Sequence, residues 1–193
     1  MIRRCWPALE ASEQMLSYHD DEWGVPVHDD RKLNEFIVLD AFQAGLSWAI
    51  VLKKREAFRE AFDNFDPERM ARFTAARIAK LAKNPEIIRN RLKIAASVTN
   101  ARAFLKIQEE FGSFDAWIWQ FVEGRTRQNK WKTLKQIPAK TRESDRMSEA
   151  LYDRGFKFVG STICYAFMQA AGMVNDHLVG CYRHAELGRD RSR

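Results

Sequence analysis

The strongest constraint on the fold is the helical spacing of apolar residues behind a series of helix-capping side chains. Asp29 and Asp30 are expected to cap a helix from about Lys32 to Ala44, with one face formed by Leu33, Phe36, Ile37, Ala41 and Ala44. Ser47 is expected to cap a second helix, whose apolar residues keep this spacing as far as Phe62. The chain has 13 Phe and 6 Trp but only 9 Gly and 5 Pro, a composition that favours packed helices over a turn-rich β protein.

The same signals continue to the end of the chain. Further helices are expected to begin at Asp66–Glu68, at Thr74, at Asn84–Glu86 (ending near Gly112), at Ser113, at Ser144 (ending at Arg154) and at Ser161 (ended by Gly172). Residues 123–143 are expected to form a basic loop and residues 176–181 a last turn or two. We therefore predict an all-α protein in which residues 1–193 form a single domain.

The distribution of charge and the lengths of the apolar runs indicate which kinds of partner the chain can have. Seven basic residues and no acid lie between Gly124 and Arg142, which suits either a polyanion partner or a solvated surface. No apolar run approaches the ~20 residues of a membrane span, and residues 1–7 show no apolar stretch behind their arginines. We expect no signal peptide, no membrane partner and a cytoplasmic location, with a monomer as the simplest state.

His177 and Cys181 stand four residues apart, on one face if their segment is helical. A thiolate with an imidazole is zinc chemistry, and a closed structural site needs two more ligands. Cys5 and His19 are the natural candidates, because Cys164 lies among apolar residues of an expected helix. The alternative is a buried thiol among unrelated histidines. His28 and His184 have no partner at ligand spacing.

Asp40 falls in the apolar stripe of its helix, at a position where Leu or Phe is expected. A lone carboxylate facing a core is costly unless it is hydrogen-bonded or lines a polar cavity. Asp40 is therefore a site candidate, although it could instead cap a helix or pair with an arginine. The aromatic residues Tyr18, Trp23, Trp48 and Trp6 could form flat walls for a planar base beside it, or simply part of the core.

Residues 155–160 (GFKFVG) connect the two helices expected between Ser144 and Gly172. Two glycines around a short apolar turn would let backbone N–H groups approach a phosphate at a helix N-terminus, as in a helix-hairpin-helix unit at about residues 144–172. An ordinary helix–helix corner is the alternative, since the usual Pro-Gly pair is absent.

Three segments make a specific resemblance: residues 18–26 (YHDDEWGVP), 43–48 (QAGLSW) and 154–165 (RGFKFVGSTICY), the last running on to Asn175-Asp176-His177. Together with residues 87–94 (IIRNRLKI), they resemble the bacterial 3-methyladenine DNA glycosylase I family from Arg4 to Cys181. The resemblance implies the helix-hairpin-helix DNA glycosylase fold, with N- and C-terminal segments joined by one structural Zn²⁺. It implies double-stranded alkylated DNA as partner and monofunctional hydrolysis of the N-glycosidic bond of 3-methyladenine, which is the product released.

Carried onto matching positions, the resemblance makes Cys5, His19, His177 and Cys181 the zinc ligands and gives a base pocket of Tyr18, Trp23, Trp48 and Trp6. Asp40 would be the catalytic pocket acid, standing where the family usually has Glu, one methylene longer. Contacts to DNA would come from Gln43, Gly45, Leu46, Gly155, Lys157, Gly160 and Ser161, with Leu46 filling the gap left by the extruded nucleotide. Met15 stands where a third Tyr is often found, and Asp176 is expected to orient a zinc-bound imidazole.

We expect the enzyme to act by extruding the base, stacking it on Trp48 and Tyr18 and hydrogen-bonding it through Asp40. Three alternatives compete with this hypothesis. The first is a zinc-stabilised protein that binds alkylation damage without cutting the bond. The second is a glycosylase with shifted methylpurine specificity. The third is a zinc-clipped helical interaction module, which predicts no salt-sensitive DNA binding.

Overall fold

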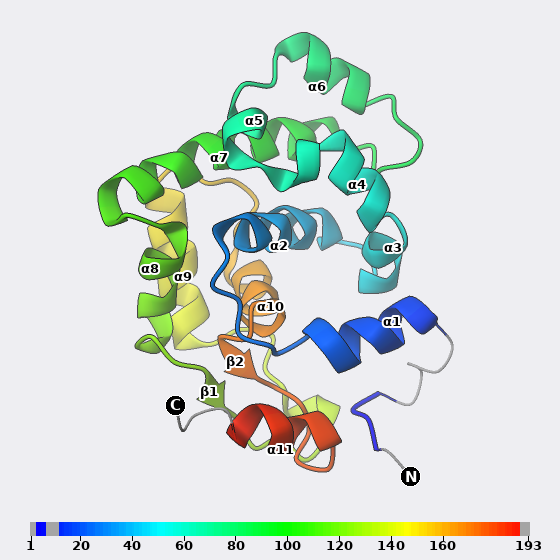
Figure 1. Cartoon of the computed structure of the whole chain (residues 1–193), viewed down its shortest axis with the longest axis vertical. Helices are drawn as coiled ribbons and strands as arrows, with labels where there is room; N and C mark the ends of the chain where they lie inside the picture. The colour runs from blue at the N-terminus through cyan, green and yellow to red at the C-terminus, as the bar shows by residue number, and fades with distance from the viewer. Residues whose placement is uncertain (1–2, 7–11, 190–193) are drawn as a thin grey trace.

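The computed structural model describes residues 3–6 and 12–189 and is mostly helical (Figure 1). Its helices before the long central one are α1 (Glu13–Ser17), a π-helix (Tyr18–Glu22), α2 (Asp30–Gln43), α3 (Trp48–Lys53), α4 (Arg55–Ala61), a 3₁₀ turn (Asp63–Phe65), α5 (Pro67–Ala71) and α6 (Ala75–Leu81). The remaining elements are α7 (Arg91–Phe111), α8 (Phe114–Ile118), 3₁₀ turns at Trp119–Val122 and Leu134–Gln136, β1 (Arg127–Gln128), α9 (Arg142–Asp153), α10 (Ser161–Ala170), β2 (Val174–Asn175) and α11 (Tyr182–Arg189). None of the described helices is long and apolar enough to cross a membrane.

Helix α2 lies in the middle of the molecule, with α4 to α7 on one side and α10 on the other (Figure 1). Every residue from Leu33 to Phe42 is buried. Leu33, Phe36 and Ile37 belong to the core shared with α8 to α10, whereas Val38, Leu39 and Phe42 belong to the core shared with α4 to α7. Because this part of α2 is buried on all sides, the Asp40 side chain is shielded from bulk water.

Several expected caps are confirmed. The side chains of Asp29, Asp66, Thr74 and Ser113 each accept a hydrogen bond from a backbone N–H in the first turn of the helix that follows. Such caps satisfy N–H groups that have no partner within the helix. The positions and starts of these helices were therefore readable from local sequence.

Other expected helix starts are wrong. The long helix α7 is capped by Asn90, and the Asn84 side chain instead accepts from Glu86 N–H in a turn. Thr141, not Ser144, caps α9; Ser144 is the third residue of the helix and closes a reciprocal capping box with Thr141. Gly160, not Ser161, precedes α10, and the Ser161 hydroxyl bonds Ser144 Oγ at 2.8 Å.

One further expectation needs correction. The helix expected after Ser47 is divided at Lys54 into α3 and α4, and the Ser47 side chain makes no capping bond. The described chain is mostly helical, as expected, with one short strand pair: β1 in the expected basic loop pairs in parallel with β2, aligning Arg127 with Val174 and Gln128 with Asn175. Residues 176–181 form turns, and the helices α1 and α11 and the π-helix were not expected.

Candidate functional site

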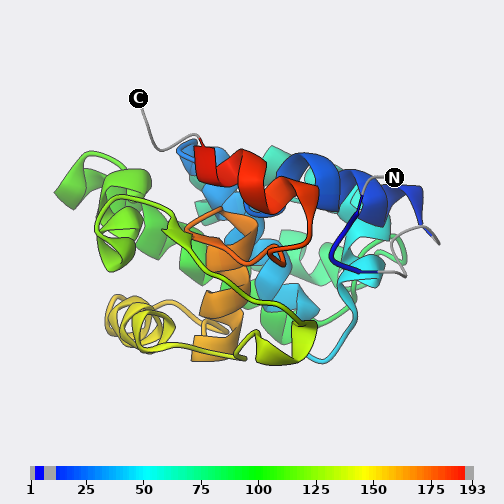
Figure 2. The ribbon, with the colours of Figure 1, turned by 90° about the horizontal axis from the view of Figure 1, so that it is seen from below.

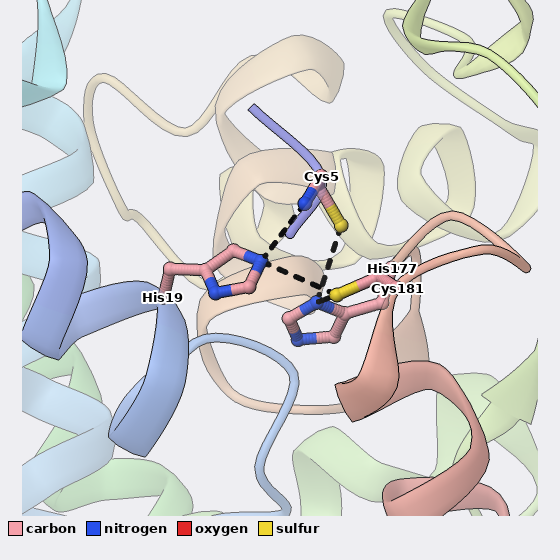
Figure 3. A group of neighbouring side chains, drawn as sticks. All are labelled: Cys5, His19, His177 and Cys181. Atoms are coloured by element: carbon pink, nitrogen blue, oxygen red, sulfur yellow. Dashed lines mark hydrogen bonds between the residues drawn. The ribbon is translucent and has the colours of Figure 1, made fainter. Parts of the chain in front are cut away.

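Cys5, His19, His177 and Cys181 meet in one buried cluster (Figure 3). All four ligand atoms lie within 4.8 Å of one another. Cys5 Sγ lies 3.4 Å from His177 Nδ1, and Cys181 Sγ lies 3.6 Å from both His177 Nδ1 and His19 Nε2. A tetrahedral zinc ion with bonds of about 2.3 Å to sulfur and 2.05 Å to nitrogen places such atoms about 3.6 Å apart. The cluster could therefore hold a metal ion.

The two imidazoles in the cluster are held by their other nitrogen atoms. His19 Nδ1–H donates to Asp20 Oδ1 at 2.8 Å, and His177 Nε2–H donates to the Trp23 carbonyl oxygen at 2.9 Å. Such partners fix the tautomer that leaves the remaining nitrogen as a ligand. The pKa of the Cys181 thiol is also lowered, chiefly because the Cys5 thiol donates a hydrogen bond to its sulfur, which favours a thiolate.

Asp176 does not touch the imidazole that follows it in sequence, so its expected orienting role is wrong. Its buried carboxylate accepts from Asn129 Nδ2 at 2.6 Å, Trp131 Nε1 at 2.8 Å, Tyr165 Oη at 2.7 Å and Gln169 Nε2 at 2.8 Å. Asp176 therefore fastens the loop after β1 to α10. Neither His28 nor His184 belongs to the metal cluster; His28 bonds Asp115, and His184 bonds the Asn129 carbonyl.

A cavity of about 320 Å³ lies next to this cluster, between α1, α2, α3 and α10. Its lining contains Trp6, Met15, Tyr18, Trp23, Asp40, Gln43, Trp48, Ile137, Ala166 and Gln169. The structure thus brings together every residue expected in the base pocket, and Gln43, expected at the DNA, is part of the same wall. Sequence reasoning missed Ile137, Ala166 and Gln169, since only the three-dimensional fold brings the loop and α10 to the pocket.

Asp40 is 2% exposed, and its Oδ2 atom has no hydrogen-bond partner among the described residues. The expected alternatives, a helix cap or an arginine pair, are not observed for this oxygen. Burial raises the pKa of the carboxyl group well above its usual range. Trp48 Nε1, on the same cavity wall, is likewise buried without a partner within the described part of the chain. Unsatisfied buried polar atoms are rare and call for a ligand or a functional explanation.

Aromatic rings form the walls of this cavity. Tyr18 and Trp48 lie with ring centroids 5.3 Å apart, and Trp6 lies 4.8 Å from Trp23. Tyr18 is buried, and its pKa is raised by burial first and by the nearby Asp40 and Glu22 charges second. The phenol therefore stays neutral, and the cavity combines flat apolar faces with one acidic group.

Tyr18 begins the π-helix, in which Trp23 N–H donates to the Tyr18 carbonyl five residues earlier at 2.8 Å. Glu22, its last residue, receives both terminal nitrogens of Arg55 at 2.7 Å. Arg55 is 7% exposed and also donates to Glu35 on α2 at 2.5 Å. Burial alone would raise the pKa of Glu22, but Arg55 outweighs it and lowers that pKa to about 2. The wall that carries Tyr18 and Trp23 is thus tied by charge to the helix that carries Asp40.

The residues expected to contact DNA lie on two turns. Gly45 (φ +84°) ends α2, and the following Leu46 is 40% exposed. Lys93 of α7 supports this turn by donating to the carbonyl oxygens of Phe42 at 3.1 Å and Ala44 at 2.9 Å. The turn is therefore a firm, exposed apolar tip beside the cavity wall.

The second turn joins α9 to α10 and contains Gly155, Lys157 and Gly160. Its positive φ angles are at Gly155 (+89°) and, unexpectedly, at Phe158 (+57°), not at Gly160. The Lys157 backbone exchanges two hydrogen bonds with Asn100 of α7, at 2.8 and 3.0 Å. With its backbone held in this way, the turn has an exposed Lys157 side chain, and α10 begins near the surface at the half-buried Ser161.

Comparisons with known proteins agree with this geometry. A family model described as methyladenine glycosylase matches residues 6–184. DNA-3-methyladenine glycosylase 1 of Escherichia coli (strain K12) is 49% identical over 166 residues, covering 86% of this chain and 89% of that protein. A crystal structure of 3-methyladenine DNA glycosylase I has 48% identity and a TM-score of 0.90, covering 93% of this chain and 98% of that one. A variant of that kind of enzyme, solved in complex with 3-methyladenine, has 35% identity and a TM-score of 0.87, covering 89% and 92%. The chain therefore belongs to the methyladenine glycosylase family.

Proposed function

We propose that the protein is a monofunctional DNA glycosylase that hydrolyses the bond between 3-methyladenine and deoxyribose in alkylated DNA. The observation that carries this proposal is the cavity with aromatic walls into which Asp40 and Trp48 bring buried polar atoms that have no partner among the residues described. Pockets of a few hundred Å³ with few polar groups hold small planar ligands. A relative of known structure was solved with 3-methyladenine bound, which fits a ligand of this kind.

The chemistry of the base suits this cavity. Methylation at N3 makes the adenine cationic while it is attached to the sugar. When the N-glycosidic bond breaks, the base takes both bonding electrons and leaves as a neutral molecule. Aromatic faces attract a cationic ring. Burial favours the protonated Asp40 before a base enters the cavity, and the entry of a cationic base would favour loss of that proton to solvent, so that the carboxylate pairs with the charge and accepts the hydrogen bonds of the base. Water then adds to the sugar carbon, gives up a proton and leaves an abasic site.

The cavity lining holds no lysine within the described residues. A glycosylase that also cuts the strand uses an amine nucleophile to form a Schiff base with the sugar. The absence of an amine among the described residues of this wall supports hydrolysis by water alone. Asp40 is the one acid that the described part of the chain contributes to the wall, so we assign it the catalytic role and assign the stacking of the base to Tyr18, Trp23, Trp48 and Trp6.

We further propose that the ion bound by Cys5, His19, His177 and Cys181 is a single Zn²⁺ with a structural role. Two thiolates and two neutral imidazoles suit zinc and balance its charge. The donor distances support a tetrahedral ion, and four protein ligands leave no open position for substrate. Such an ion supplies a cross-link between the start and the end of the chain. It would hold Trp23 through the His177 bond to its carbonyl group.

DNA would be held by the α9–α10 unit, as a helix-hairpin-helix, and by the Gly45–Leu46 turn. The N-terminus of α10 offers backbone N–H groups and a positive dipole end for a phosphate. Ala166, five residues or about 7.5 Å along the same helix, lines the base cavity. The phosphate grip and the pocket are therefore parts of one rigid element. Leu46 is the residue we assign to the gap left in the duplex.

The test is to incubate the purified protein with methylated duplex DNA and to separate released bases by chromatography. We expect free 3-methyladenine and strands that break only after alkali treatment at abasic sites. Binding of methylated DNA without base release would instead support a damage-binding protein. Release of a different methylpurine in preference to 3-methyladenine would require a changed specificity.

A further inference from the structure

The loop after β1 carries positive charge that the structure leaves unneutralised. Lys130, Lys132 and Lys135, here called the basic rim, are all exposed, and their ammonium groups have no partner among the described residues. Two neighbouring basic residues differ, because Arg127 of β1 pairs with Glu143 and Lys140 of the loop pairs with Asp145. The rim thus places three cations without a partner among the described residues within six consecutive residues, 130–135.

The rim is held in one shape by bonds on both sides. Trp131 is fixed through its indole N–H to Asp176 at 2.8 Å and through its carbonyl to Val179 N–H at 2.9 Å. The Gln136 side chain accepts from the backbone N–H groups of Lys132 at 2.7 Å and Thr133 at 3.1 Å. Because the loop is already ordered, its three lysines stay near one another in the free protein. Its backbone therefore loses little conformational freedom when a partner binds.

The position of the rim relates it to the base cavity. Ile137, two residues after Lys135, lines the cavity beside Trp48 and Asp40. Seven residues further on, Ser144 bonds Ser161 at the start of α10. In Figure 2 the 3₁₀ turn Leu134–Gln136, the start of α10 and the turn between α2 and α3 all lie along the lower edge of the molecule. The rim therefore shares one face with both turns assigned to DNA.

We propose that the basic rim is a binding surface for the phosphate backbone of the strand that carries the damaged nucleotide. This proposal rests on the proposed function, because the strand is identified by the base that enters the cavity. When a nucleotide is extruded into the cavity, its neighbouring phosphates must lie at the cavity entrance. The rim adjoins this entrance, because Ile137, two residues after Lys135, lines the cavity. Lysines bind phosphates as point charges and release condensed counterions. The rim contributes affinity without reading sequence.

The test is the salt dependence of DNA binding by a variant in which Lys130, Lys132 and Lys135 are all replaced by Gln. A duplex containing a tetrahydrofuran abasic-site analogue is titrated by fluorescence anisotropy between 50 and 200 mM KCl. Each lost phosphate contact reduces the slope of log K against log salt by about 0.9, so three contacts reduce it by about 2.7. Over this fourfold salt range the wild-type affinity should fall about 40-fold more than that of the variant.

A matched control replaces Arg69, Arg72 and Lys80 with Gln. These exposed residues lie on or next to α5 and α6, at the opposite end of the molecule from α11 (Figure 1), and have no ion pair in the described structure. A slope change of at least 1.8 in the rim variant, with less than 0.9 in the control, supports the proposal. A smaller change, or an equal one in the control, overturns it.

Base release is measured on the same preparations, so the two proposals fail separately. Wild-type protein that releases 3-methyladenine while the rim variant keeps its salt slope refutes the rim alone. Wild-type protein that releases no base, with a rim-dependent slope, refutes excision and leaves the rim as a DNA-binding surface. Unchanged melting temperature in the rim variant shows that its binding defect does not arise from unfolding.

Discussion

Replacing Asp40 by Asn should stabilise the protein at neutral pH while weakening its hold on the base. Burial raises the pKa of Asp40 in the folded state well above 3.8, the usual value for an aspartic acid in water. The contribution of such a group to stability is fully present below the unfolded pKa and is lost as pH rises through the folded pKa. The folded protein is therefore progressively destabilised as pH rises above about 4 and until it passes the raised pKa of the folded state.

The size of this effect follows from proton linkage. While the folded carboxyl stays protonated, each pH unit above 3.8 costs about 1.36 kcal/mol, so the total at pH 7 has a ceiling of about 4 kcal/mol. Asn carries no such penalty. Its buried amide hydrogens lack partners and cost about 1–3 kcal/mol, but equally at every pH. The free energy of unfolding of Asp40→Asn minus that of the wild type should therefore grow with pH.

The assay is urea unfolding of both proteins at pH 5, 6 and 7, with the exposed Asp153→Asn as a control for the loss of one charge. We expect the difference for Asp40→Asn to rise by up to about 1.36 kcal/mol per pH unit. A difference that is flat across this range would show that the carboxyl ionises in the folded protein as it does in water, and the argument from burial would be refuted. Binding of 3-methyladenine, followed by tryptophan fluorescence, should weaken about 10- to 100-fold, the value of one charge-assisted hydrogen bond of about 1.5–3 kcal/mol.

Three other perturbations probe the surroundings of the pocket. Arg55→Lys keeps the charge but loses the two-pronged contact to Glu22, so it should destabilise the fold by about 1.5–3 kcal/mol, the value of a lost hydrogen bond between charged groups, as measured by urea unfolding; a loss below about 0.5 kcal/mol would contradict a structural role for this contact. Cys181→Ser should lower metal content, measured by atomic absorption, and the melting temperature together; full metal retention would show that Cys181 is not a ligand. At Gly172 (φ +69°) an added Cβ would overlap the backbone of Val25 and Pro26, whereas at Gly155 (φ +89°) it meets nothing within 4 Å. Gly172→Ala should therefore prevent folding, and Gly155→Ala should cost about 1–2 kcal/mol in thermal unfolding; equal losses would disprove the packing argument.

Local sequence was sufficient where one residue decides a structure by itself. Asp29, Asp66, Thr74 and Ser113 cap the helices they were expected to cap, since a side chain three residues from a free N–H needs no tertiary help. Where two capping residues compete, sequence misleads. Thr141 and Ser144 belong to one reciprocal capping box, and the outer residue is the true cap.

The site was predictable to a different depth. The four residues whose side chains could hold a metal ion, and the buried acid Asp40, stood out because Cys, His and a lone Asp are unusual in apolar segments. The resemblance then placed the aromatic walls. Ile137 and Gln169 carried no such signal, because an isoleucine in a basic loop and a glutamine on a helix are common at positions with no functional role. Asp176 was misassigned for the same reason: its neighbour in sequence is His177, but its partners come from α10 and the loop between β1 and α9.

The cluster of Cys5 and His19 with His177 and Cys181 has a consequence for synthesis on the ribosome. Trp23 is made early, but the His177 side chain that holds its carbonyl group comes 154 residues later. At translation rates of about 5–20 residues per second, roughly 8 to 30 s separate the two. The nascent chain therefore waits with an unfinished pocket wall. Cys5 and His19 therefore lack the other two members of their cluster until the segment that carries His177 and Cys181 has emerged.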